Sequence, residues 1–76
     1  MAQFKYSTHL NQSNVPAFDR EWQPGQIVAN GGIYRCKACG DETAVGKGGV
    51  LPKEHHRHDV LGPVVWNMLV FAQQRP

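Results

Sequence analysis

The 76-residue sequence contains no run of 18 apolar residues, which a membrane-spanning helix requires, so we expect no membrane partner. Its first nine residues, MAQFKYSTH, also lack the apolar segment that a secretory signal carries. These two absences together favour a cytoplasmic protein. In the reducing cytoplasm, cysteine thiols are available to bind a metal instead of pairing in a disulfide.

The chain also lacks a large excess of charged residues of one sign. Eight Lys and Arg stand against six Asp and Glu, for a formal net charge of +2. Nucleic-acid-binding domains usually gather their basic residues on one face, whereas here these residues are spaced singly along the chain. The net charge by itself therefore does not indicate a nucleic-acid partner.

The chain is also short for an enzyme. A protein of 76 residues buries too little apolar surface to build a deep catalytic pocket, so we expect one that is not an enzyme. A single core of this size rarely supplies more than about 3–5 kcal/mol, and small chains usually add a disulfide, a metal or a partner. The sequence must therefore contain a stabilising device besides its core.

Eight Gly and five Pro divide the chain into short segments. Residues 1–23 are polar with isolated aromatic residues and no periodicity, which predicts an irregular arm, either packed across the domain or mobile. Residues 24–76 form the predicted domain. Its β-prone segments are 26–29, 33–35, 43–45, 50–51 and 64–72, separated by Gly-rich turns.

Residues 64–72 (VVWNMLVFA) are the most apolar segment, and their β-branched residues predict a strand, with a helix as the alternative. In a regular strand, Val64, Trp66, Met68 and Val70 share one face, while Val65, Leu69 and Phe71 share the other with Asn67. Both faces are then apolar. The second face needs a cover, either the N-terminal aromatic residues or a second copy of the chain.

Four residues have the spacing of a zinc site. Cys36 and Cys39 are two residues apart, 15 residues separate Cys39 from His55, and His58 follows His55 after two more. Thiolates and imidazoles in a set of four suit tetrahedral zinc, and Gly40 permits the tight turn that the cysteines need. His56 is an alternative ligand, because His56 and His58 form a second possible pair. Binding by four protein ligands closes the metal's coordination shell, which argues against catalysis.

Other interpretations of these residues remain open. The cysteines are alternatively a redox pair or inert buried thiols, although a redox pair normally begins a helix in a larger fold. A nucleic-acid-binding role would use basic residues beside the site, with Tyr34 or Trp66 stacking on bases. The basic residues are Arg35, Lys37, Lys47, Lys53 and Arg57. A remote third alternative is an HNH-like metal-dependent nuclease that uses His55, His56 and Asn67.

Residues 32–40 (GIYRCKACG), together with Glu42, Lys47-Gly48, Leu51-Pro52 and Trp66, resemble small bacterial zinc-ribbon proteins. The resemblance spans about residues 24–72 and implies a rubredoxin-like fold: a three-stranded antiparallel sheet with two ligand-bearing turns. In that family a second Cys pair follows Leu-Pro-Pro, whereas here the region carries histidines. We therefore expect a structural Cys2His2 zinc site in an interaction module, whose partner is a protein or a second copy bound through the C-terminal strand.

Overall fold

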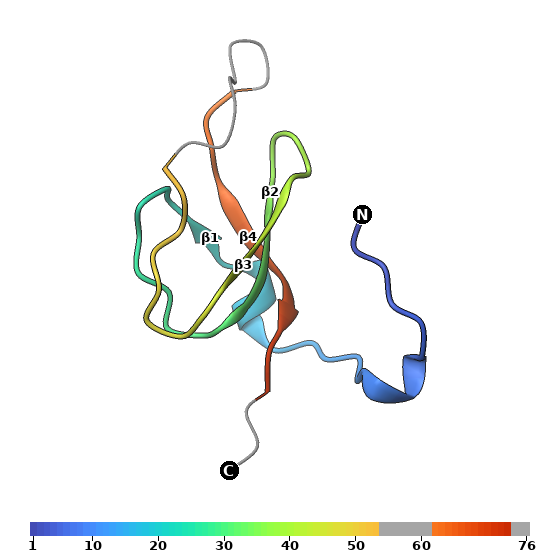
Figure 1. The fold of residues 1–76 in the computed structure, drawn as a ribbon. Coiled ribbons are helices and arrows are strands. Elements are labelled where there is room, and N and C mark those ends of the chain that lie inside the picture. The colour runs from blue at the N-terminus through green and yellow to red at the C-terminus, as the bar shows by residue number, and fades with distance from the viewer. Residues whose placement is uncertain (54–61, 74–76) are drawn as a thin grey trace.

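The computed structural model describes residues 1–53 and 62–73, which form one four-stranded antiparallel sheet with strand order β1-β4-β2-β3 (Figure 1). The strands are β1 (Glu21–Trp22), β2 (Gly32–Cys36), β3 (Glu42–Val45) and β4 (Trp66–Phe71). The described helical turns are short 3-10 segments, η1 (Ser7–His9) and η2 (Pro16–Asp19). None of the helices described is long and apolar enough to cross a membrane. The prediction of a small, mainly β protein with an irregular N-terminus is confirmed.

The sheet has four strands where the resemblance implied three. The additional strand, β1, lies within the predicted arm and pairs with β4 through Glu21↔Asn67 and Trp22↔Trp66. Two residues are too few to show a strand periodicity, so β1 has no signal in the sequence. Residues 1–23 thus contain two parts: an outlying stretch and a stretch, η2 with β1, that joins the domain.

Strands β2 and β3 include the predicted segments 33–35 and 43–45 and form a hairpin, with Gly32↔Val45 and Arg35↔Glu42 at its two ends. The predicted segments 26–29 and 50–51 meet as a single bridge, Ile27↔Val50, instead of as full strands. Gly32 is required where β2 passes β4, because a Cβ there would lie 2.0 Å from the Val70 carbonyl oxygen.

The C-terminal segment is a strand, but its two faces differ from the prediction. Ile33 pairs with Val70 and Tyr34 pairs with Met68, so Leu69 is an extra residue at a β-bulge. Beyond the bulge the alternation reverses: Phe71 faces the core side opposite Gly32, while Val70 joins Ile33 on the other face. The predicted assignment of Val70 and Phe71 to faces is therefore wrong.

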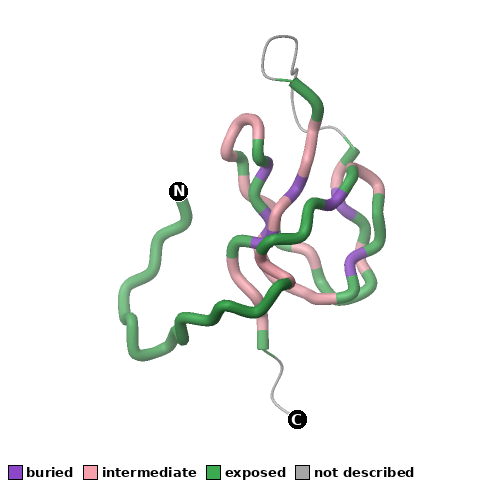
Figure 2. The backbone as a smooth tube through the Cα atoms, turned by 180° about the vertical axis from the view of Figure 1, so that it is seen from behind, coloured by how far each residue is buried: buried purple, intermediate pink, exposed green. Residues whose placement is uncertain are grey.

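The core lies on one side of the sheet, where the buried positions gather (Figure 2). Val28 and Leu51, from the bridged segments, cover this side and are fully buried. From η2, Phe18 packs edge-on against Phe71 with ring centroids 6.3 Å apart. The buried residues are Trp22, Val28, Tyr34, Cys36, Leu51, Trp66 and Met68. Within residues 1–53 and 62–73, seven side chains are buried in this core, and partly buried residues such as Phe18 and Phe71 pack against them.

Candidate metal centre

The two cysteines lie in the turn between β2 and β3. Cys36 is the last residue of β2, and the chain reverses so tightly that the Gly40 N–H donates to the Cys36 carbonyl (2.8 Å). The Cys36 N–H in turn donates to the Asp41 carbonyl (2.7 Å). Gly40 adopts φ 86°, a conformation that residues with a Cβ rarely take. The predicted role of Gly40 in a tight cysteine turn is therefore confirmed.

The thiols of Cys36 and Cys39 interact directly and are not joined in a disulfide. Burial raises the pKa of Cys36, but hydrogen bonds from the backbone of Cys39 and Ala38, from the Cys39 thiol and from the Val65 backbone outweigh it and lower the pKa overall. For Cys39, burial together with the adjacent Cys36 sulfur and Asp41 raises the pKa. The turn thus favours a thiolate at Cys36, and the thiolate is the form that binds zinc.

Burial differs between the two sulfur-bearing residues. Cys36 is wholly buried against the core, while Cys39 is half-buried. An ion held by both would lie at the end of the sheet, shielded by the core on one side. Thiolate donors on a tight backbone turn fit zinc chemically, but two thiolates supply only half of a tetrahedral shell.

The predicted histidine ligands His55, His56 and His58 lie outside the described residues. Within residues 1–53 and 62–73, no three His, Cys, Asp or Glu side chains come together as a metal site. His9, the remaining histidine, lies in η1 of the arm, where its ring meets Tyr6 edge-on at 6.0 Å. The described part of the chain therefore shows one half of the predicted ligand set.

Both flanks of segment 54–61 are bonded to the cysteine end of the sheet. On the N-terminal side, the Pro52 carbonyl accepts a hydrogen bond from Trp66 Nε1 (3.1 Å), and Trp66 pairs with Cys36. On the C-terminal side, the Val65 carbonyl accepts from the Lys37 N–H (2.8 Å), inside the cysteine turn. These hydrogen bonds depend on which strands pair, so they have no signal in the sequence.

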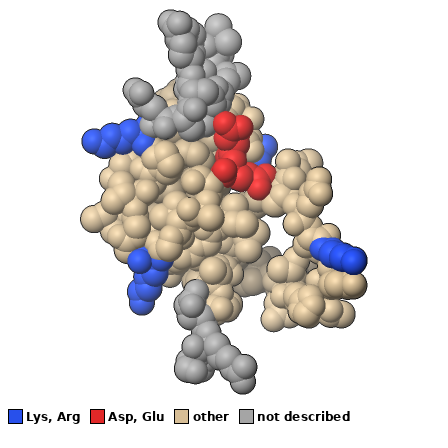
Figure 3. Space-filling view, in the orientation of Figure 1, with Lys and Arg blue, Asp and Glu red and all other residues tan. Residues whose placement is uncertain are grey.

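Two basic side chains on this side of the fold, Lys37 and Arg20, are engaged within the molecule. Lys37 Nζ contacts Glu21 Oε2 at 2.5 Å, which links the turn to β1. The Arg20 guanidinium lies 3.8 Å above the Trp22 ring. On the face that Figure 3 shows, basic side chains are separated and do not form one patch. An extended basic surface is not seen on this face.

The predicted base-stacking residues are not accessible. Tyr34 is fully buried and donates from its hydroxyl to the Asn30 carbonyl (2.6 Å), and Trp66 is 1% exposed. The prediction that Tyr34 or Trp66 stacks on bases is therefore wrong. Asn67, named for the nuclease alternative, donates from its amide to the Arg20 carbonyl (3.0 Å) and so joins β4 to the segment before β1.

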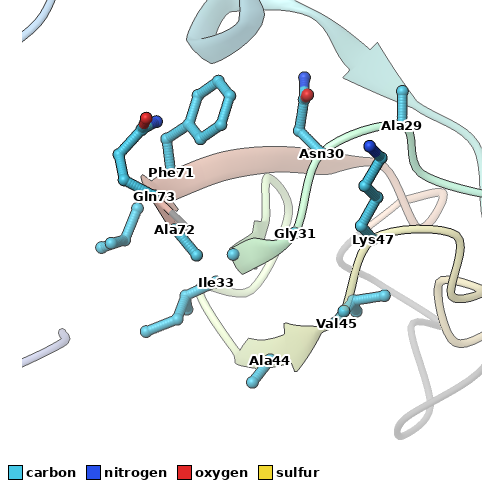
Figure 4. A pocket seen from close by; sticks show the side chains of 13 residues that line it. Ala29, Asn30, Gly31, Ile33, Ala44, Val45, Lys47, Phe71, Ala72 and Gln73 are labelled. Carbon is cyan, nitrogen blue, oxygen red and sulfur yellow. The ribbon is translucent and has the colours of Figure 1, made fainter. Parts of the chain in front are cut away.

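A groove of about 680 Å³ lies where β2 begins and β3 and β4 end, which is the opposite end of the strands from the cysteine turn (Figure 4). Glycines and alanines form much of its wall, and Lys47 and Asn30 project on one side of it. Ile33 and Ala44 project on the other side. None of the described residues that line this groove is a His, Cys, Asp or Glu, and Lys47 is the charged residue among them.

The fold and the cysteine turn define a small, mainly β protein with a candidate two-thiolate metal centre. No protein-family model matches the chain, and no solved structure matches it. The chain is 38% identical over 50 residues to Protein L of Escherichia coli, a match that covers 64% of this chain. The chain spans 58% of the length of that protein.

Proposed function

We propose that this protein is a small zinc-binding interaction module in which Cys36, Cys39, His55 and His58 hold one structural zinc ion. The observation that supports this set is the attachment of both flanks of segment 54–61 to the cysteine end of the sheet, Pro52 through Trp66 of β4 and Val65 through Lys37 of the cysteine turn. His55 follows Pro52 by three residues, which span at most about 10 Å.

Zinc would supply the stability that seven buried side chains do not. Zinc binding in small folded peptides contributes about 10–16 kcal/mol at neutral pH, more than a core of this size provides. A set of four protein ligands leaves no position for a reacting water, so the metal's role in this proposal is structural. In this proposal the surface of the domain carries the function, which is to bind a protein partner in the cytoplasm.

Metal analysis of the purified full chain tests the site. We expect one zinc per chain, and the cobalt-substituted protein should show the absorption bands of tetrahedral cobalt bound to thiolate. Replacing Cys39→Ser, His55→Ala or His58→Ala singly should weaken metal binding by at least about 10-fold. His56→Ala distinguishes the two histidine pairs, because it should leave affinity unchanged if His55 and His58 are the ligands.

His9→Ala is the matched control, since it removes the one histidine that lies outside the segment and stays exposed in η1. It should leave zinc stoichiometry and the cobalt spectrum unchanged. A chain that binds no zinc, or one that retains it when both cysteines are replaced by serine, would contradict the proposal.

A further inference from the structure

The first 15 residues, here called the arm, extend from the domain with their apolar side chains exposed (Figure 1). Phe4 is 67% exposed and Tyr6 57%. The large apolar side chains of the arm that lie open to solvent are Met1, Phe4, Tyr6, Leu10 and Val15. The radius of gyration, 12.9 Å, exceeds the roughly 11 Å expected for a compact chain of this length. The arm thus presents apolar surface that its own domain does not cover.

The sheet has a partly exposed apolar face of its own. Opposite the core, Ile33 pairs with Ala44 and with Val70, and the bulge residue Leu69 is 37% exposed beside them. We call Ile33, Ala44, Leu69 and Val70 the outer face. Ala44 and Leu69 are exposed, Ile33 and Val70 are half-buried, and none of the four belongs to the core cluster. The arm and the outer face are therefore two surfaces of one chain that leave apolar side chains open to solvent.

Charge links the arm to this side of the sheet. The arm carries the terminal ammonium and Lys5 and has no acidic residue. Glu42 lies on the outer side, where it pairs with Arg35, and its carboxylate lies 3.6 Å from the Met1 ammonium. Figure 3 shows acidic side chains on the body of the domain next to the arm. The positively charged N-terminal end of the arm is thus complementary to Glu42, which lies beside the outer face.

The contact of the arm with its own domain leaves the aromatic side chains of the arm uncovered. With Met1 beside Glu42, the side chains of Phe4 and Tyr6 remain in solvent. Fifteen extended residues reach at most about 50 Å, which exceeds the longest dimension of the molecule, 39 Å. An arm of this length can therefore cross to the outer face of another copy.

We infer that the arm docks on the outer face of a second copy of this chain, in a reciprocal exchange that forms a two-fold symmetric dimer. Phe4 and Tyr6 cover Ile33, Leu69 and Val70, and the Met1 ammonium keeps its acidic partner across the interface as Glu42 of the second copy. This inference deepens the proposed interaction role by naming the partner, and it does not depend on the zinc site.

The aromatic residues of the arm supply much of the area that a specific interface needs. Two aromatic side chains bury about 300–500 Å² per arm, so the reciprocal exchange buries about 600–1,000 Å² from these residues. Stable complexes bury about 1,200–2,000 Å² in total, to which the aliphatic residues of the arm and the outer face also contribute.

Sedimentation equilibrium of the full chain tests the dimer. We expect Phe4→Ser with Tyr6→Ser to raise the dimer Kd by at least about 10-fold. Ile27→Ser with Val50→Ser is the matched control, because these residues are equally exposed but form the bridge between segments outside the outer face. The control should leave the dimer Kd unchanged. Zinc content is measured on each variant, so loss of the metal and loss of the dimer are read separately.

A photo-reactive phenylalanine analogue at position 4 identifies the contact. Copies labelled with ¹⁴N and ¹⁵N are mixed and irradiated, and cross-linked peptides are sorted by mass. Cross-links between the two isotopes that end in residues 69–70 support the exchange. A monomer at about millimolar concentration, or cross-links confined to one isotope, would overturn it whether or not the chain binds zinc.

Discussion

At the scale of single residues, the cysteine turn depends on Gly40. Its φ of 86° is costly for any residue with a Cβ, and an added Cβ would lie 3.2 Å from the Arg35 guanidinium. We predict that Gly40→Ala lowers the free energy of unfolding of the zinc-loaded protein by roughly 1–2 kcal/mol. Urea unfolding followed by circular dichroism measures this change.

Gly46→Ala provides the comparison for that experiment. Gly46 has no positive φ, and an added Cβ would meet no atom within 4 Å. This variant should change the free energy of unfolding by less than about 0.5 kcal/mol. Equal losses in the two variants would show that the turn at Gly40 does not require glycine.

Tyr34 makes stability depend on pH in the alkaline range. Burial raises its pKa above the ordinary value of 10.0, and the Arg20 charge offsets part of this effect. Because the folded-state pKa exceeds that of the unfolded chain, the stabilisation is complete below about pH 10 and is lost as pH rises through the folded-state pKa. We predict that the free energy of unfolding falls in this range, as measured by urea unfolding at a series of pH values.

Tyr34→Phe is the control for the pH series. It removes the titrating hydroxyl together with its hydrogen bond to the Asn30 carbonyl, so it should cost about 1 kcal/mol at neutral pH. The alkaline decline should then be shallower than in the unaltered protein. A decline of the same steepness in both would assign it to other groups.

At the scale of elements, Trp66 connects β4 to the segment that leads to the histidines. Its indole N–H donates to the Pro52 carbonyl, whereas the N–H of the equally buried Trp22 has no partner among the described residues. We predict that Trp66→Phe costs about 1 kcal/mol for the lost hydrogen bond, in addition to the cost of lost packing. It should also weaken zinc binding, because it removes the hydrogen bond that ties Pro52, two residues before segment 54–61, to β4 beside Cys36.

Trp22→Phe makes a similar change in ring size without breaking such a bond. Zinc affinity, measured by competition with a chelator of known affinity, should be unchanged in Trp22→Phe and lowered in Trp66→Phe. If both variants bind zinc as the unaltered chain does, the tie at Pro52 does not position the ligands.

The elements also show what sequence could and could not predict. The β-branched and aromatic residues of β2, β3 and β4, bounded by Gly and Pro, were enough to place these strands. The faces of β4 were assigned in part wrongly, because the bulge at Leu69 arises from pairing with β2 and leaves no local signal. Strand β1 is two residues long, and pairing with β4 specifies it. The Cys36–Cys39 spacing was enough to predict half of the candidate site. The hydrogen bonds at Pro52 and Val65 depend on how the strands pair and could not be predicted from the sequence.

At the scale of the whole molecule, the apolar residues are divided between a small core and two partly exposed surfaces, the arm and the outer face. In the part of the chain that the structure describes, seven side chains are buried, and the arm and outer face leave about as many exposed. This distribution leaves apolar surface in contact with water, which lowers solubility. It also leaves few side chains in the core to stabilise the fold. A bound metal and a second copy are two independent ways to compensate, one in the cysteine turn and the other on the outer face of the sheet.

The metal contribution can be measured by removing the zinc. A ligand that binds the folded but not the unfolded state raises stability by RT ln(1 + [L]/Kd), which is about 4.1 kcal/mol at a free concentration 1,000 times Kd. We therefore predict that complete chelation lowers the midpoint of thermal unfolding by more than about 10 °C, since 1 kcal/mol corresponds to about 4–8 °C in a domain of this size. Differential scanning calorimetry with and without chelator measures the shift, and restoring zinc should reverse it. The variant Cys36→Ser with Cys39→Ser is the control, because its midpoint should be insensitive to the chelator. An unaltered chain whose midpoint does not move on chelation would show that the seven-residue core stabilises the fold without a metal.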